Sequence, residues 1–392
     1  MIVAEISFWS TIGLVLWSYL GYPALLALLA PKSSTDALDL DSKPEVDVIF
    51  AAYNEESVIE DKIHSIFSGS YPSEKLHVHI GSDASTDATD EIVTRLEKQY
   101  PTLKLHRMPG RTGKSGIINH LVSISTSPII LASDANIFFE RDMISRMVAN
   151  IQQDNVALVG GNIVYRDARS EGIAQEENFY LGYENTIKSR ESKLWGFALG
   201  VEGGCYMIER NAFSTIPPLT FMEDFYMTMS VLQHGHNVNF DAQAICTEDV
   251  SVDRSEEFKR KIRISIGNYQ NLSRFKGMVL RRFWPLGFAF LSHKIIRWIT
   301  PLLILFNLIA CAILSGFEDD WIYQAALLTH LILLATFAID AVLPRLAGRS
   351  SVIRFVGHFY LMNFALLKGL IIYLQGVDTN VWQPTKRAQK RS

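Results

Sequence analysis

The apolar residues of this 392-residue chain are concentrated at its two ends. Residues 6–30 carry no charged side chain, and about 20 such residues are enough for a helix to cross a hydrocarbon core. The length of the run, its missing basic n-region and its missing cleavage site favour an uncleaved anchor over a signal peptide. Residues 298–316, 321–343 and 352–374 form three further apolar runs. We predict an integral membrane protein.

The charges between the apolar runs predict its orientation. We expect the chain to lie in the plasma membrane. Basic residues prefer the cytosolic side, and the linker between the last two runs has Arg345, Arg349 and Arg354 in or beside it, so we expect this linker in the cytosol. The acidic residues 318–320 then lie outside, and the polar middle of the chain lies inside. If the last apolar run spans the membrane, the basic tail lies outside, against the tendency of basic residues to lie in the cytosol. A re-entrant or interfacial last helix is the alternative.

The middle of the chain alternates between two periodicities. Apolar runs rich in β-branched residues predict strands, and runs with one apolar face predict helices. The predicted strands are 46–52, 76–80, 103–107 and 128–133, and the predicted helices are 56–67, 87–100 and 114–125. This order predicts an α/β domain with a mainly parallel sheet and helices on both faces. Ligands of such sheets bind beyond the carboxyl ends of the strands.

These patterns divide the chain into five parts. We expect an N-terminal anchor and linker at 1–44, the α/β domain at 45–254, and amphipathic interfacial helices at 255–297. Membrane-spanning helices follow at 298–376, and a basic tail occupies 377–392.

Polar residues follow three of the predicted strands, and helix caps and turns also favour such residues. Tyr53 can offer an aromatic face to a nucleotide base, and Asp83 can accept hydrogen bonds from the base or ribose. Asp134 can hold Mg²⁺ or Mn²⁺, which prefer carboxylate oxygens. Arg111 and Lys114 lie in a glycine-rich segment that lacks the spacing of a phosphate loop.

Four segments carry a specific resemblance: Ala52-Tyr53-Asn54-Glu55, residues 82–87 (Ser-Asp-Ala-Ser-Thr-Asp), Gly113-Lys114 and Ser133-Asp134-Ala135-Asn136. In this combination and order they resemble the inverting family 2 glycosyltransferases of GT-A fold, over about residues 45–300. Among these the chain is most similar to membrane synthases of the poly-N-acetylglucosamine, hyaluronan and cellulose type. The resemblance implies a nucleotide-sugar donor bound by the residues Ala52, Tyr53, Glu55, Asp83, Lys114, Asp134 and Arg263.

The resemblance also implies an acceptor site and a general base. A small-residue segment of such enzymes lines the acceptor sugar, which corresponds here to Gly203, Gly204 and Cys205. Asp224 takes the position of the general base, and Glu223 is expected at the acceptor. The simpler interpretation is that both acidic residues only stabilise the N-terminus of a helix through its dipole. Direct displacement at the anomeric carbon needs such a carboxylate and inverts the stereochemistry.

The chain departs from the pattern of the family in two places. Processive members carry Gln-x-x-Arg-Trp where this chain has Arg260, Arg263 and Ile264, so a stacking ring for the acceptor is missing. Asn136 stands where many members have a second metal-binding aspartate, and an amide ligand carries no charge. Residues 382–387 resemble a tryptophan-containing gating loop of hyaluronan-type enzymes.

Charge and composition exclude some other classes. The formal charge is −4 with no dense basic stripe, so we expect no nucleic-acid partner. We expect a UDP-sugar donor, N-acetylglucosamine or a related hexose as the sugar, a growing polysaccharide as acceptor, and Mg²⁺ or Mn²⁺ as cofactor. A lipid acceptor such as polyprenyl phosphate or a glycolipid, an inactive membrane scaffold, and a nucleotidyltransferase are the alternatives.

Overall fold

The computed structural model describes residues 1–31, 38–166, 173–249, 254–317, 320–342 and 350–380. The chain forms two compact units. The helical unit comprises residues 1–28, 170–177 and 252–376, and the sheet unit comprises residues 29–169, 178–251 and 377–392. The boundaries of the five predicted parts stay predictions. The predicted gating loop at 382–387 lies outside the described residues.

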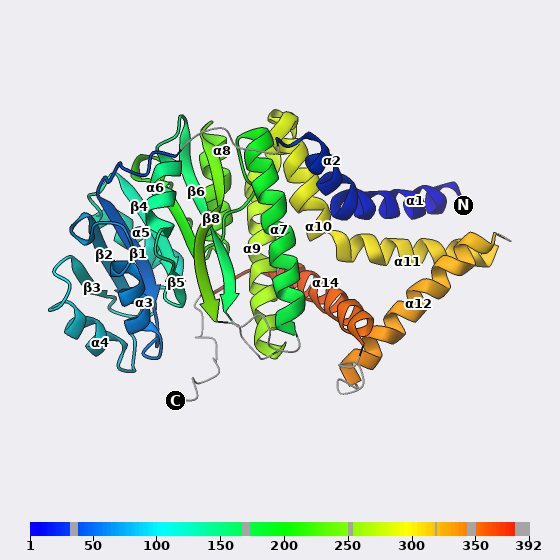
Figure 1. Ribbon diagram of the computed structural model, residues 1–392. Helices are drawn as coiled ribbons and strands as arrows, with labels where there is room; N and C mark the ends of the chain where they lie inside the picture. Colours follow the sequence, from blue (N-terminus) through cyan, green and yellow to red (C-terminus); the bar gives the residue numbers. More distant parts are fainter. Residues whose placement is uncertain (32–37, 167–172, 250–253, 318–319, 343–349, 381–392) are drawn as a thin grey trace. The chain divides into compact units, whose positions relative to one another are not determined.

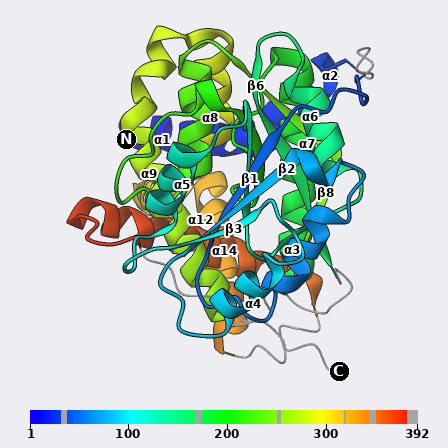
Figure 2. The same ribbon diagram turned by 90° about the vertical axis from the view of Figure 1, so that its left-hand side faces the viewer.

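In its described part, the sheet unit is built on eight strands in the order β3-β2-β1-β4-β7-β6-β8-β5. Figure 2 shows β3, β2 and β1 running side by side. The strands are β1 Val46–Ala52, β2 Leu76–Ser82, β3 Leu103–Arg107, β4 Ile129–Asp134, β5 Ile137–Phe139, β6 Val156–Arg166, β7 Cys205–Glu209 and β8 Asn237–Asp249.

The first four strands form the parallel half of this sheet. β1 pairs in parallel with both β2 and β4, and β2 pairs in parallel with β3. The antiparallel strand β7 separates this half from the parallel pair β6–β8, and β5 pairs antiparallel with β8. The mostly parallel α/β sheet that the sequence predicts is therefore confirmed, with antiparallel strands added in its second half (Figure 1).

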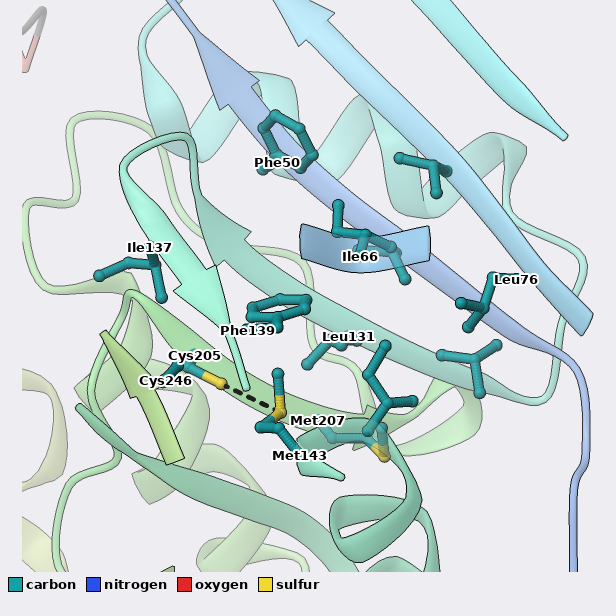
Figure 3. Packing of buried hydrophobic residues seen from close by; sticks show 14 of the residues in the cluster. Phe50, Ile66, Leu76, Leu131, Ile137, Phe139, Met143, Cys205, Met207 and Cys246 are labelled. Atoms are coloured by element: carbon teal, nitrogen blue, oxygen red, sulfur yellow. Dashed lines mark hydrogen bonds between the residues drawn. The ribbon is translucent and has the colours of Figure 1, made fainter. Parts of the chain in front are cut away.

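Six of the helices in this unit flank the strands. They are α3 Ile59–Phe67, α4 Thr89–Leu96, α5 Lys114–Ile124, α6 Met143–Ile151, α8 Glu223–Gln233 and the larger part of α7 Ile173–Trp195. One face of the sheet packs against α3 and α6, where Phe50, Ile66, Leu131, Phe139 and Met143 meet in one buried cluster (Figure 3). Each such side chain contributes about 1.5–3 kcal/mol when it leaves water.

The opposite face receives α5 at very short range. A Cβ at Gly81 would lie 2.1 Å from Cγ2 of Ile117, so only glycine lets the helix approach β2 this closely. Because α5 begins at Lys114, directly after Gly113, this approach fixes the first turn of the helix beside the carboxyl end of β2. The fold thereby places Lys114 at the edge where ligands of parallel sheets bind.

Among the residues that the structure describes, the helical unit contains four helices that are long and apolar enough to cross a membrane. They span Ile2–Leu29, Thr300–Phe317 (α11), Trp321–Val342 (α12) and Ser351–Gln375 (α14). The first consists of α1 Ile2–Leu16, a π-helical turn at Trp17–Gly21, and α2 Tyr22–Leu29. The unit also holds the long helix α9 Arg254–Arg281, further π-helical turns at Phe283–Gly287 and Phe290–Ile295, and the short α10 Ile296–Trp298.

A polar cluster joins three of these apolar helices. The amide of Asn307 on α11 donates to the carbonyl of Phe8 at 3.0 Å and to Oγ1 of Thr11 at 2.8 Å, both on α1. Nε2 of His330 on α12 lies 2.8 Å from Oδ1 of Asn307. Because an unsatisfied polar group is costly in an apolar setting, these bonds fix the pairing of the three helices.

Candidate active site

The carboxyl ends of β1 and β2 place Asp83 and Tyr53 around one glycine-rich loop. Asp83 is fully buried, and its carboxylate accepts a hydrogen bond from Nε of Arg111 at 2.9 Å and from the backbone N–H of Thr112 and Gly113. The guanidinium of Arg111 also lies 3.3 Å above the ring of Tyr53. Asp83 therefore shapes the loop before α5, and Arg111 covers the aromatic face that the sequence analysis assigns to a base.

Two further predicted donor-site residues are Ala52, which ends β1, and Glu55, three residues later. The carbonyl of Ala52 accepts the backbone N–H of Asp83 at 2.8 Å, which ties the ends of β1 and β2 together. Glu55 is buried, and its backbone N–H donates to Oγ1 of Thr89 at 2.8 Å. Asn54, between Tyr53 and Glu55, has a positive φ of 53° that asparagine tolerates well.

Lys114 is the centre of the charged groups. Its ammonium lies 2.7 Å from Oδ1 of Asp134, at the end of β4, and 2.6 Å from Oε1 of Glu223, at the start of α8. Burial lowers the pKa of Lys114, but the two carboxylates outweigh burial and raise its pKa well above the usual value. The lysine thus stays charged, and it joins three elements that are far apart in the sequence.

Asp224 lies next to this ion-pair cluster and is itself buried. Burial, and then the charge of Glu223, raise the pKa of Asp224 to about 7, although Lys114 acts in the opposite direction. A carboxylate with a pKa near 7 can take up a proton at neutral pH, which is what a general base must do. Glu223, one residue earlier, forms the ion pair with Lys114 instead.

The acceptor-site residues of the sequence analysis lie around Asp224 and Asp134. A Cβ on Gly203 would lie 3.1 Å from Oδ2 of Asp224, so the backbone of Gly203 lies directly against the carboxylate. The carbonyl of Gly204 accepts the backbone N–H of Asp134 at 3.3 Å. The side chain of Cys205 faces the core, where its thiol lies 3.9 Å from Sδ of Met143 (Figure 3). Contacts of Cys205 with a ligand are therefore limited to its backbone.

Two further predicted site residues, Asn136 and Arg263, are not part of the ion pairs of Lys114. The amide nitrogen of Asn136 donates to Oε1 of Glu248 at 2.9 Å, so its amide oxygen is the atom that a metal would take. Arg263 lies on α9 in the helical unit, so its role toward a donor diphosphate stays a prediction.

Tyr206 is a site residue to which the sequence analysis gives no role. Its hydroxyl is buried, and it has no hydrogen-bond partner among the residues that the structure describes. Burial and then Glu223 raise its pKa, so the phenol keeps its proton beside the carboxylates. Alternation along β7 provides the signal: Cys205 points into the core, so Tyr206 must point toward the opposite face.

Asn380 also reaches this region from the C-terminal end of the chain. Its amide donates to Oγ of Ser115 at 2.8 Å and to the carbonyl of Thr220 at 3.4 Å. A Cβ on Gly113 would lie 2.8 Å from Oδ1 of Asn380, so the two residues are in close contact. Sequence reasoning gave no signal for this contact, because the pattern of a polar tail says nothing about where it folds back.

These groups converge on the loop that ends at Gly113 and on Lys114. Asp83 binds the loop that ends at Gly113, the next residue Lys114 binds Asp134 and Glu223, and Asp224 follows Glu223. Three aspartates separated by 51 to 141 positions therefore surround one short segment.

The sequence of the chain is also similar to those of known proteins. Residues 47–216 match the family model of glycosyl transferase family 2. A beta-monoglucosyldiacylglycerol synthase of Synechocystis sp. is 31% identical over 157 residues, which are 38% of this chain and 33% of the relative. A poly-beta-1,6-N-acetyl-D-glucosamine synthase of Staphylococcus aureus is 23% identical over 258 residues, 62% of each chain. The chain thus matches about a third of the first relative and less than two thirds of the second.

The fold has a match that extends over nearly the whole chain. A mannosyltransferase from Pyrobaculum calidifontis, solved in complex with GDP-Man and Mn²⁺, superimposes with a TM-score of 0.69 at 21% identity. The match covers 93% of this chain and 97% of the mannosyltransferase. Residues 47–216 therefore form a family 2 glycosyltransferase domain, and the chain has the GT-A fold.

Proposed function

We propose that the chain is a membrane-bound, inverting glycosyltransferase that transfers a hexose, with N-acetylglucosamine as the first candidate, from a UDP-sugar to a growing polysaccharide. The observation that carries this proposal is the environment of Asp224. Its carboxylate is buried with a pKa of about 7, and its neighbour Glu223 is joined through Lys114 to Asp134. The match of the polysaccharide synthase over 62% of both chains supports the acceptor class.

In the proposed reaction Asp224 acts on the acceptor. A hydroxyl of the acceptor attacks the anomeric carbon of the donor sugar, and its proton passes to the carboxylate of Asp224. The new bond joins the acceptor oxygen to the anomeric carbon, and the bond from that carbon to the diphosphate breaks. The nucleoside diphosphate leaves with the electron pair, and the configuration at the anomeric carbon inverts. Gly203 leaves room beside Asp224 for the acceptor because it has no side chain.

The residues at the end of β4 fit a divalent cation, Mg²⁺ or Mn²⁺. Such cations are commonly bound by one or two protein carboxylates, with substrate phosphates as further ligands. The side chain of Asp134 is 37% exposed at a strand end, and Asn136 follows two residues later. Among the described residues no group of three or more acidic, His or Cys side chains could hold a metal by itself. A cation held by Asp134 and Asn136 would neutralise the diphosphate that leaves.

The other predicted residues hold the donor in this proposal. Tyr53 and Asp83 bind the base and ribose, with Ala52 and Glu55 as their immediate support. Lys114 and Arg263 neutralise the diphosphate, since ammonium and guanidinium groups bind phosphate oxygens well. The complex of the Pyrobaculum mannosyltransferase with GDP-Man and Mn²⁺ supports a nucleotide-sugar donor and a divalent metal.

We further propose that the chain lies in the plasma membrane with its sheet unit in the cytosol. The four apolar helices support membrane insertion, and the arginines in and beside the linker 343–350 support this orientation. A cytosolic sheet unit has direct access to nucleotide sugars. Lipids of the bilayer then surround the helical unit.

A lipid acceptor is the second candidate. The 31% identity to a synthase of glucosyldiacylglycerol favours it, and so does Ile264, which stands where processive relatives have a stacking tryptophan. A single transfer to a lipid needs no repeated binding of a lengthening chain. The catalytic groups in both candidates are the same, so only the product separates them.

The decisive experiment is a product assay with the full chain in detergent and Mn²⁺. Purified protein is incubated with a panel of radiolabelled UDP- and GDP-sugars, with either oligosaccharide or diacylglycerol as acceptor. The proposal expects a UDP-sugar to give products of increasing length. A single labelled lipid would replace the first candidate with the second, and no transfer from any donor would contradict both.

A further inference from the structure

Lys62, on the core-facing side of α3, is a fully buried lysine inside the apolar centre of the sheet unit. Its Nζ lies 3.5 Å from the centre of the Phe139 ring and 5.5 Å from that of Phe50. Among the described residues no carboxylate lies within ion-pair distance of it, and burial lowers its pKa to about 7. A lysine is costly at such a place, where methionine would pack without desolvation.

The hydrogen bonds of Lys62 go to the two sides of the predicted metal loop. Nζ donates to Oγ of Ser133 at 2.8 Å and to the carbonyl of Ile137 at 2.5 Å. Ser133 directly precedes Asp134, and Ile137 directly follows Asn136. Lys62 therefore holds both ends of the segment that joins β4 to β5. Either protonation state of the amine has enough N–H donors for both bonds.

Ser133 carries this link onward to the acceptor side of the site. Its hydroxyl donates to the carbonyl of Gly204 at 2.8 Å, and the backbone N–H of Asp134 donates to the same carbonyl at 3.3 Å. The side chain of Lys62 thus connects the loop of Asp134 with the segment that contains Gly203 and Gly204. The two segments lie at the ends of the paired strands β4 and β7, and the buried amine adds a side-chain link between them.

We propose that Lys62 is a positioning residue that holds Asp134 and Asn136 in the arrangement needed to bind a divalent cation together with a nucleoside diphosphate. This inference rests on the proposed function, since it concerns the same metal site. Removal of a group that orients metal ligands without touching the metal commonly weakens metal affinity by about 10–100-fold. Lys62 touches neither metal nor substrate, so its effect must pass through Ser133 and Ile137.

The test measures Mn²⁺ binding directly on the full chain in detergent. Free Mn²⁺ is counted by electron paramagnetic resonance during titration in the presence of UDP, and no sugar transfer is required. Lys62→Met should weaken Mn²⁺ binding about tenfold or more. Methionine fills the same apolar space but leaves the carbonyl of Ile137 without this donor, so the melting temperature is measured to show that the variant is folded. Equal Mn²⁺ binding by wild type and Lys62→Met would overturn the inference.

Ser133→Ala provides a second variant in case the first does not fold. It keeps the lysine but removes its acceptor, and it should weaken Mn²⁺ binding in the same direction. If both residues act through one link, the double variant should be little weaker than Lys62→Met alone. Fully additive losses would show that the two residues act separately and would contradict the inference.

Ile66→Val is the matched control on the same helix, one turn after Lys62. Ile66 is buried in the core and makes no polar contact with the loop, so this change should lower the melting temperature without moving the Mn²⁺ titration. If Ile66→Val weakened Mn²⁺ binding as much as Lys62→Met, core packing would explain the effect. A wild-type protein that binds no Mn²⁺ with UDP would instead refute the metal site of the proposed function, and the inference with it.

Discussion

The carboxylate of Asp224 lies directly against the backbone of Gly203. A Cβ at position 203 would be 3.1 Å from Oδ2 of Asp224 and 3.4 Å from Nζ of Lys114. Few real Cβ atoms come so close to a neighbour, so any larger residue must displace one of these groups by a few tenths of an ångström. In an enzyme, displacements of this size in the reacting groups change the rate strongly.

We therefore expect Gly203→Ala to lower kcat about tenfold to a hundredfold, while the KM for the donor changes little. Steady-state kinetics with the donor found in the product assay measures both constants. Gly182→Ala is the control, since position 182 of α7 is exposed and a Cβ there meets nothing within 4 Å. Unchanged kinetics in Gly203→Ala would contradict this expectation, because it would show that a methyl group fits beside Asp224 without displacing it.

Asp224→Asn should abolish transfer and leave donor binding intact. The amide has nearly the same shape but cannot accept the proton of the acceptor, and a general base contributes about 10²–10⁴-fold to the rate. Single-turnover assays measure the loss, and calorimetric titration with UDP and Mn²⁺ measures binding. Glu209→Gln, on the exposed end of β7, changes charge equally and should keep full activity. Transfer by Asp224→Asn at a tenth of the normal rate or more would exclude Asp224 as the base.

The first half of the sheet was predictable because each strand there is a continuous apolar run. Residues 46–52 were predicted as a strand, and β1 is Val46–Ala52 with every residue buried. The helix predicted at 56–67 begins only at Ile59, because the backbone N–H groups of Val58 and Ile59 both turn back to the carbonyl of Glu55. The residues of such a turn show the same pattern of polar and apolar side chains as the first turn of a helix, so periodicity cannot distinguish a turn from a helix start.

The second half was not predicted strand by strand, and β6 shows why. Gly160 and Gly161 interrupt its apolar run, which weakens the signal of a strand. The need for glycine comes from a tertiary contact, since a Cβ on Gly161 would lie 2.7 Å from Sγ of Cys205. Likewise, the polar residues after each strand indicated a site, but the link from Lys114 to Glu223 joins residues 109 positions apart. No local pattern contains that contact.

Removal of divalent metal should stop transfer, and Mn²⁺ or Mg²⁺ should restore it. EDTA is added to saturation, removed by dialysis, and replaced by each metal in turn before the rate is measured. In Asp134→Ala more Mn²⁺ should be needed for half-maximal activity, by about tenfold or more, because the carboxylate of the proposed metal site is lost. Glu56→Gln, an exposed carboxylate outside the ion-pair cluster, is the control. A rate that EDTA leaves unchanged would remove Asp134 from its metal role.

Asp224 also determines how the rate should depend on pH. Its carboxylate must be deprotonated to accept the proton of the acceptor, and its pKa is raised to about 7 by burial and by Glu223. The sign follows directly: below pH 7 most molecules carry a protonated, inactive base. We expect kcat/KM to rise about tenfold per pH unit below pH 7 and to level off above it, since this constant reports the free enzyme.

The Glu223→Gln variant tests whether this limb of the profile belongs to Asp224. Loss of the neighbouring negative charge removes a cause that raises the pKa of Asp224, and it leaves Lys114 with one carboxylate fewer to balance its charge. Both changes stabilise the ionised form of Asp224, so the midpoint of the profile should move to lower pH. The shift is measured as the change in the midpoint of kcat/KM between pH 5 and 9. A midpoint that stays in place, or that moves upward, would assign the profile to a group other than Asp224.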